Sequence, residues 1–189
     1  MAFCHPSFMR RVVMMLALGA ALLAGCKSSE PGKSASRDEF KKLAGAPAGL
    51  AGLYRQPSKL LGGGKDGFEK RIEKLRGHPV VVTAWASWCG PCRFEFPFFQ
   101  RQAVKRGKQV AFLGVNSQDN QDDATKFLDD YPLPFPSYED PDGEVAHLFK
   151  VVGLPATAYY DRRGELAYLH QGAYASEAKL GEDIERYAR

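Results

Sequence analysis

The pattern of apolar and polar residues along the chain predicts a domain in which buried strands alternate with helices. Residues 80–85 (VVVTAW) form a β-branched apolar run with the length of one buried strand, and residues 109–116 (QVAFLGVN) form a second. Residues 91–106 lie between these runs and have a helical pattern. Residues 53–54 (LY) are expected to open the folded domain as a short edge strand.

Four further segments have apolar residues on one helical face. In residues 67–76 the side chains of Phe68, Ile72 and Leu75 recur at the spacing of one stripe, and Asp66 is the expected N-cap. The same kind of pattern predicts helices over residues 122–131, 143–150 and 177–187.

The last third of the chain predicts a β-hairpin before the final helix. Residues 158–160 lead into the polar turn 161–164 (DRRG), and residues 165–170 return as a second strand. Residues 137–138 form a short segment after a proline-rich loop. Strands joined by helices and followed by a hairpin are typical of an α/β sandwich.

Cys89 and Cys92 lie where the apolar run 80–85 gives way to the helical pattern. The first N–H groups of a helix lack intrahelical partners and carry partial positive charge, so they stabilise a thiolate. We therefore expect the pKa of the Cys89 thiol to fall from about 8.5 toward roughly 3.5–7. Cys92 lies about one turn into the helix, within reach of a disulfide. The two sulfurs form a two-electron redox pair.

Two other interpretations of the cysteine pair are weaker. A tetrahedral zinc site needs four ligands, but Cys4 and Cys26 belong to the N-terminal leader, and His78, His147 and His170 are dispersed. A purely structural disulfide across two residues closes almost no loop and restrains the unfolded chain very little. We therefore expect a redox-active disulfide, no metal and no separate cofactor.

The sequence around the pair resembles a known family. Residues 88–92 (WCGPC) match the thioredoxin motif, and residues 92–97 (CRFEFP) look like the CxxExP extension of the TlpA/ResA branch, the membrane-tethered extracytoplasmic thioredoxin-like proteins. The resemblance covers about residues 53–187. It implies the thioredoxin fold, a three-layer α/β/α sandwich with a central mixed sheet, and residues 122–150 resemble the central helix–strand insertion of this branch.

The resemblance assigns roles to the residues that match the family's motifs. It implies that Cys89 is the attacking thiolate and Cys92 the resolving thiol. Pro155 matches the family's cis-proline opposite the cysteine pair, and the backbone of Leu154 is expected to pair with an extended partner chain. Without the resemblance, residues 153–155 are a turn that enters a strand.

The expected substrate-binding surface also includes Trp88, Gly90 and Pro91. Trp88 shields the thiol and offers an apolar docking surface. Pro91 removes an N–H that the first helical turn leaves unpaired, and the Gly90–Pro91 dipeptide is that of reducing thioredoxins. Reduction potentials of related proteins run from about −270 mV for thioredoxin to about −120 mV for the strongest oxidants. The dipeptide favours reduction but is only one determinant of the potential.

Glu95 has two interpretations. Periodicity alone makes it a solvated residue in the first turns of a helix. The resemblance makes it an acid beside the thiols that exchanges a proton with Cys92, and a partly buried carboxyl with a raised pKa suits that role. Thr83 stands where many thioredoxins have a buried Asp, and it cannot exchange protons near neutral pH. This departure increases the expected importance of Glu95.

The N-terminus has the pattern of an exported lipoprotein. Arg10 and Arg11 precede the apolar run 12–24, which is shorter than the roughly 20 residues of a membrane-spanning helix. The run ends in LAGC, which resembles the bacterial lipobox and implies a lipid on Cys26. An ordinary signal peptide or an uncleaved anchor is the alternative. We expect a signal peptide over residues 1–25, a flexible tether over 26–52 and the thioredoxin-like domain over 53–189.

Charge and cysteine count narrow the function further. The formal net charge is +4 with no basic stripe, which argues against nucleic acid as a partner. With the leader removed and Cys26 lipidated, Cys89 and Cys92 are the only free thiols, which suits an oxidising compartment. We expect a monomer anchored outside the bacterial cell membrane as a lipoprotein.

The expected activity is thiol–disulfide exchange. The leading hypothesis is reduction of specific protein disulfides, as in cytochrome c maturation, with electrons from a membrane thiol carrier. The alternatives are oxidative disulfide formation, a peroxidase of the peroxiredoxin type and a copper-binding assembly factor. The peroxidase needs a PxxxTxxC arrangement that residues 84–92 lack, and the copper site needs a CxxxC pair with a His.

Overall fold

The computed structural model describes Met1 and residues 34–189. Cys4, Cys26 and all but the first residue of the expected signal peptide lie outside the described residues. None of the helices in the described part has the length and apolar character that crossing a membrane requires.

Six strands form one mixed sheet: β1 (Leu60–Leu61), β2 (Val80–Trp85), β3 (Ala111–Ser117), β4 (Ser137–Asp140), β5 (Ala156–Tyr160) and β6 (Leu166–Gln171). Their order is β1-β4-β3-β2-β5-β6. The first four in this order run parallel, and β5 and β6 continue the sheet as an antiparallel hairpin. Every residue of β2 is buried, as is typical of a strand with helices on both faces.

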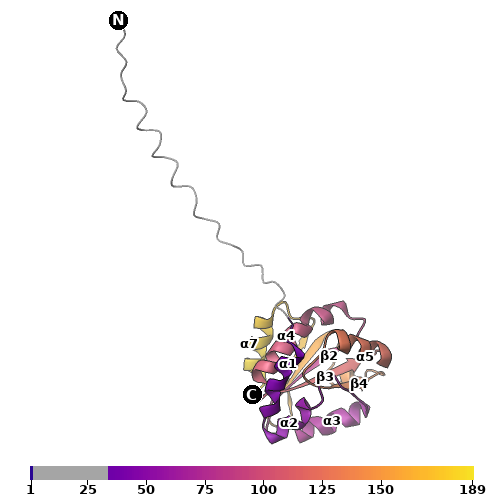
Figure 1. Cartoon of the computed structure of the whole chain (residues 1–189). Coiled ribbons are helices and arrows are strands. Elements are labelled where there is room, and N and C mark those ends of the chain that lie inside the picture. The colour runs from indigo at the N-terminus through magenta and orange to yellow at the C-terminus, as the bar shows by residue number, and fades with distance from the viewer. Residues whose placement is uncertain (2–33) are drawn as a thin grey trace. The chain divides into compact units, whose positions relative to one another are not determined.

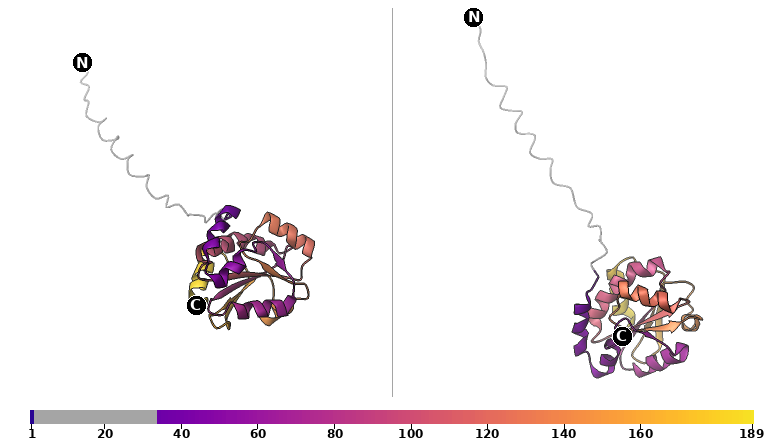
Figure 2. Two further views of the ribbon diagram at one scale, coloured as in Figure 1. Left: turned by 60° about the horizontal axis from the view of Figure 1, so that its bottom comes forward. Right: turned by 45° about the vertical axis from the view of Figure 1, so that its right-hand side comes forward.

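Helices cover both faces of this sheet, which confirms the three-layer sandwich (Figure 1). Trp85 of β2 packs against Phe96 and Phe127, with ring centroids 5.2 and 5.3 Å apart. Phe68 packs edge-on against Tyr138 on the opposite face, at 5.9 Å. The first face carries α4 (Gly90–Arg106), α5 (Gln121–Asp130) and α7 (Glu177–Tyr187), and the second carries α3 (Gly64–Lys74) and α6 (Glu144–Leu148). The two faces are seen from other sides in Figure 2.

The predicted elements after residue 60 appear in the predicted order. The helix expected over residues 177–187 is α7, and the helix expected over 91–106 is α4 with one residue added. The α5, β4 and α6 elements form the expected insertion between β3 and β5. One predicted cap was wrong: α3 begins after Gly63, whose φ of 98° is left-handed, so Asp66 lies inside the first turn.

The segment before residue 53 is folded from residue 35 onward, so the tether expected over residues 26–52 was wrong in that part. Leu43, Leu50 and Leu53 are buried in the core, and the N–H of Ala35 donates to Gln100 Oε1 at 3.0 Å. The many small and polar residues of this segment obscure the spacing of its few leucines in the sequence. Its short helices are stable only when these leucines pack against the rest of the domain. The segment contains α1 (Arg37–Phe40), the 3-10 turn η1 (Lys41–Gly45) and α2 (Ala48–Tyr54).

The strand expected at residues 53–54 was also wrong, because these residues end α2. The edge strand is β1, which pairs with β4 through Leu60 and Leu61. Tyr54 instead anchors the helix, since its hydroxyl donates to the carbonyl of Val110 at 2.7 Å. Within the described residues, the folded domain therefore includes residues 35–54.

Candidate redox site

Cys89 and Cys92 form a disulfide at the N-terminus of α4. Cys89 is the N-cap of the helix, and its Sγ accepts the N–H of Cys92 at 3.2 Å. The two Cα atoms are 5.3 Å apart. Cys89 is 3% exposed and Cys92 is fully buried, so the sulfur nearer to solvent is the predicted attacking one.

The loop between β2 and α4 is held by Asp119, which sequence analysis missed. The N–H and hydroxyl of Ser87 donate to the Asp119 carboxylate at 2.5 and 2.7 Å. The indole of Trp88 donates to the carbonyl of Gln118 at 3.0 Å. Because β2 and β3 are parallel, the segments that follow them meet at one edge of the sheet. Applied to the polar residues after β3, this rule could have identified Asp119 from the sequence.

The surface in front of Cys89 is apolar and exposed. Trp88, the residue before Cys89, is 63% exposed, and Val152, in the loop before Pro155, is 89% exposed. Gly90 and Pro91 are exposed as well. Phe94 is a further exposed aromatic residue near the start of α4, with its ring against Phe98, and sequence analysis did not single it out.

Pro155 lies at the same end of the sheet as the disulfide. The next residue, Ala156, pairs with Ala84 at the end of β2, so the loop before β5 is brought beside the loop before α4. The Leu154–Pro155 peptide bond is cis, as the resemblance implies. Leu154 is half-buried and Pro155 is buried.

Glu95 is fully buried on α4, so the solvated interpretation is excluded. Its Oε2 accepts the N–H of Tyr174 at 2.9 Å, while Oε1 has no hydrogen-bond partner among the described residues. Burial raises the pKa of Glu95 to about 8, and the hydrogen bond from Tyr174 opposes part of that rise. A carboxyl with this pKa can hold or release a proton near neutral pH.

Two buried threonines lie on the face of the sheet that α4 covers. Thr83 and Thr157 are paired across β2 and β5, and alternation along each strand places them on the same side as Trp85 and Tyr159. The hydroxyl oxygens of both threonines have no hydrogen-bond partner among the described residues. Since neither hydroxyl titrates near neutral pH, neither threonine can replace Glu95 in exchanging a proton with Cys92.

His147 and His170 lie on other elements than the disulfide. His147 is exposed on α6, and His170 is half-buried on β6 beside Tyr174. In the part of the chain that the structure describes, no three His, Cys, Asp or Glu side chains are arranged to hold a metal ion.

The fold and the cysteine pair together define a thioredoxin-fold protein with a disulfide at a helix N-terminus. The model of the AhpC/TSA family matches residues 58–169, and the chain belongs to that family.

Its relatives include proteins named for thiol–disulfide chemistry. Thiol-disulfide oxidoreductase ResA of Oceanobacillus iheyensis is 34% identical over 104 residues, which is 54% of each chain. Thiol:disulfide interchange protein DsbE of Vibrio cholerae is 30% identical over 164 residues, which is 86% of each chain. Several of the alignments, including those with ResA of O. iheyensis and with DsbE of Xylella fastidiosa, span about half the length of the curated relative.

Solved structures agree with the sequence comparison. A protein described as thiol:disulfide interchange protein DsbE from Chlorobium tepidum is 32% identical with a TM-score of 0.57, covering 61% of this chain and 83% of that one. A secreted Mycobacterium tuberculosis disulfide oxidoreductase is 25% identical with a TM-score of 0.54, covering 59% of this chain and 84% of that one.

Proposed function

We propose that this protein is an extracytoplasmic thiol–disulfide oxidoreductase that reduces disulfides of partner proteins. The observation that carries the proposal is the Cys89–Cys92 disulfide at the start of α4, with the buried carboxyl of Glu95 on the next turn of the same helix. The relatives named thiol-disulfide oxidoreductase and thiol:disulfide interchange protein support it.

The proposed reaction is two successive exchanges. In the reduced protein the Cys89 thiolate attacks one sulfur of the partner disulfide, and the partner's other sulfur leaves as a thiolate. Cys92 then loses its proton and attacks Cys89, which releases the second partner sulfur. The partner gains two electrons, and the Cys89–Cys92 disulfide is formed. A membrane thiol carrier is the proposed donor that restores the dithiol.

Glu95 is the proposed acceptor of the Cys92 proton. Its pKa of about 8 is close to the ordinary thiol value of about 8.5, so the proton moves between the two groups at a small free-energy cost. In the reverse exchange the same carboxyl returns the proton.

Partner docking is assigned to the exposed surface in front of Cys89. Trp88 supplies apolar contact area, Gly90 and Pro91 leave the sulfur accessible, and the backbone of Leu154 pairs with an extended partner chain beside Pro155. The specific task that the TlpA/ResA resemblance favours is reduction of apocytochrome c. A lipid on Cys26 would hold the monomeric domain beside its membrane donor.

A peptide assay tests both the general proposal of disulfide reduction and the specific proposal of apocytochrome c reduction. The full chain is reduced, freed of reductant and mixed with an oxidised CxxCH peptide, the haem-attachment motif of c-type cytochromes, or with a CxxCA control. We expect reduction of the CxxCH peptide and a potential for the cysteine pair below about −200 mV. Equal rates with both peptides would refute the cytochrome task alone. No reduction of either peptide, with consumption of hydrogen peroxide instead, would refute the oxidoreductase assignment.

Membrane attachment is tested separately in cells fed a labelled fatty acid. The Cys26→Ser variant should lose the label that the unchanged chain carries. Equal processing and retention of the two chains would show that the lipobox interpretation is wrong.

A further inference from the structure

The only hydrogen bond that the described residues give to the Glu95 carboxyl comes from a distant loop. Tyr174 lies between β6 and α7, and its backbone N–H donates to Glu95 Oε2 across 79 positions of sequence. An N–H that binds a carboxylate favours its charged form. The position of this loop therefore acts directly on the proton affinity of Glu95.

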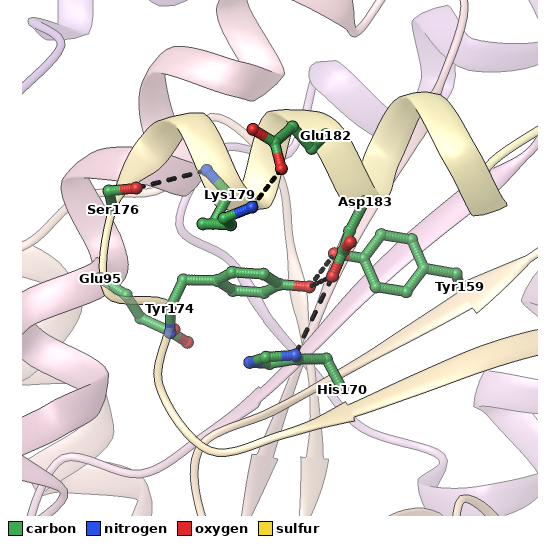
Figure 3. Close-up of polar contacts among 8 residues, drawn as sticks. All are labelled: Glu95, Tyr159, His170, Tyr174, Ser176, Lys179, Glu182 and Asp183. Atoms are coloured by element: carbon green, nitrogen blue, oxygen red, sulfur yellow. Dashed lines mark hydrogen bonds and ion pairs between the residues drawn. The ribbon is translucent and has the colours of Figure 1, made fainter.

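The side chain of Tyr174 is fixed by three neighbours from three elements (Figure 3). Its hydroxyl donates to Asp183 Oδ2 on α7 at 2.7 Å, and it lies 2.6 Å from the hydroxyl of Tyr159 on β5. Its ring stacks on His170 of β6, with centroids 4.0 Å apart and planes 15° apart. We call Tyr159, His170, Tyr174 and Asp183 the Tyr174 cluster.

The direction of the hydrogen bonds in the cluster follows from its proton count. Tyr174 has one hydroxyl proton and donates it to Asp183, so the Tyr159 hydroxyl must donate to the Tyr174 oxygen. Burial raises the pKa of both tyrosines, so both stay protonated across the physiological range. The two hydrogen bonds therefore run in one direction, from Tyr159 to Tyr174 and from Tyr174 to Asp183.

The loop that carries Tyr174 is also held where it enters α7. Ser176 caps α7 by accepting the N–H of Lys179 at 3.3 Å. The other charged groups drawn with the cluster, Lys179 and Glu182, pair with each other at the surface (Figure 3). On the remaining sides, the titratable groups that face Tyr174 are His170, whose Nδ1 is 3.9 Å from Asp183 Oδ2, and Glu95.

We propose that Tyr174 is a positioning residue for Glu95, and that its cluster holds the loop so that Oε2 is bound and Oε1 is left for the proton exchanged with Cys92. The proposal rests on the role of Glu95 in the proposed function. Tyr174 acts only through the Glu95 carboxyl and takes no part in the exchange of sulfurs itself.

The Tyr174→Phe variant of the full chain is the main test. It keeps the backbone N–H and the ring but removes the hydroxyl that Asp183 and Tyr159 hold. The freed loop should bind the carboxylate less firmly, so the pKa of Glu95 should rise by roughly 0.5–1 unit. Two readouts follow this shift: the carboxyl ¹³C titration of labelled glutamate, assigned with Glu95→Gln, and the pH profile of peptide reduction.

Tyr168→Phe is the matched control. It removes the same atom from a tyrosine on β6 that stacks on Tyr187 at 4.0 Å and whose hydroxyl makes no hydrogen bond within residues 34–189. This variant should titrate like the unchanged chain. A shift in it equal to that of Tyr174→Phe would show that any lost hydroxyl has this effect, and would overturn the proposal.

Asp183 provides a second pair of variants if Tyr174→Phe does not fold. Asp183→Asn keeps an oxygen that accepts from Tyr174 and should retain most of the normal titration, whereas Asp183→Ala should shift it upward. A folded Tyr174→Phe with the normal Glu95 midpoint, or normal midpoints in both Asp183 variants, overturns the proposal. The carboxyl titration distinguishes this failure from failure of the proton-transfer role proposed for Glu95, which is shown by a Glu95→Gln variant whose rate profile matches that of the unchanged chain.

Discussion

The two sides of the Cys89–Cys92 disulfide differ in both exposure and chemistry. The front is apolar and open, with Trp88 largely exposed next to Cys89. The back is closed and polar, with Glu95 fully buried on the turn of α4 that follows Cys92, and with Thr83 and Thr157 buried in the sheet. The front offers contact area to a partner chain, and the back controls a proton. Variants on the two sides should therefore change different kinetic quantities.

Loss of either sulfur should have the largest effect, because both exchanges need a thiolate. Cys89→Ser should abolish peptide reduction. Cys92→Ser should stop at the mixed disulfide, which non-reducing gels detect as a trapped complex. In Cys92→Ser the alkylation rate of Cys89 should titrate with an apparent pKa below about 8. A value at or above the ordinary thiol value of about 8.5 would contradict activation by the helix N-terminus.

Glu95→Gln should lower the rate of partner reduction by roughly 10–100-fold, because the amide cannot titrate. It should also remove the limb of the pH–rate profile that reflects the pKa of about 8. The disulfide should still form. A rate and a profile like those of the unchanged chain would mean that the back of the site takes no part in catalysis.

The same substitution has a stability consequence whose sign follows from the pKa. Burial raises the pKa of Glu95 from 4.5 to about 8, so between these values the folded state holds a proton that the unfolded state has lost. The free energy of unfolding should therefore fall by a few kcal/mol as pH rises through this window. Urea unfolding of the oxidised chain at several pH values should show this slope, and Glu95→Gln should lack it.

Trp88→Ala tests the front and should have a smaller effect. The lost apolar contact should raise the KM for a peptide partner by roughly 3–10-fold, while the pH profile stays unchanged. Leu166→Ala is the control, since Leu166 is an exposed apolar residue paired with Tyr160, at the other end of the β5–β6 ladder from Ala156. A change in the pH–rate profile of Trp88→Ala would show that the exposed front also influences the proton step at the back.

Asp119→Asn should have the smallest effect on activity. Its carboxylate accepts hydrogen bonds from Ser87, Asn116 and Asn120, and the amide keeps only one acceptor oxygen. We expect the free energy of unfolding to fall by about 1–2 kcal/mol, because hydrogen bonds to a charged group are replaced by neutral ones. Peptide reduction should fall less than in Trp88→Ala. A larger loss of rate would show that Asp119 also shapes the surface in front of Cys89.

Local patterns in the sequence were sufficient for much of the fold and for the redox pair. The apolar run of β2, the helix after it and the spacing of Cys89 and Cys92 depend on neighbouring residues only. The same holds for α7, whose predicted bounds match the observed ones, and for the position of Pro155 at the entry to β5.

Other features were decided by contacts between residues far apart in the chain. Composition suggested a tether before residue 53, and only burial of Leu43, Leu50 and Leu53 in the domain core makes that segment fold. Periodicity alone made Glu95 a solvated helix residue, and packing against the sheet placed it inside. The bond between Glu95 and Tyr174 joins positions 79 residues apart. Sequence patterns of period 2 or 3.6 describe one element at a time, whereas the pKa of a buried carboxyl depends on which elements close around it.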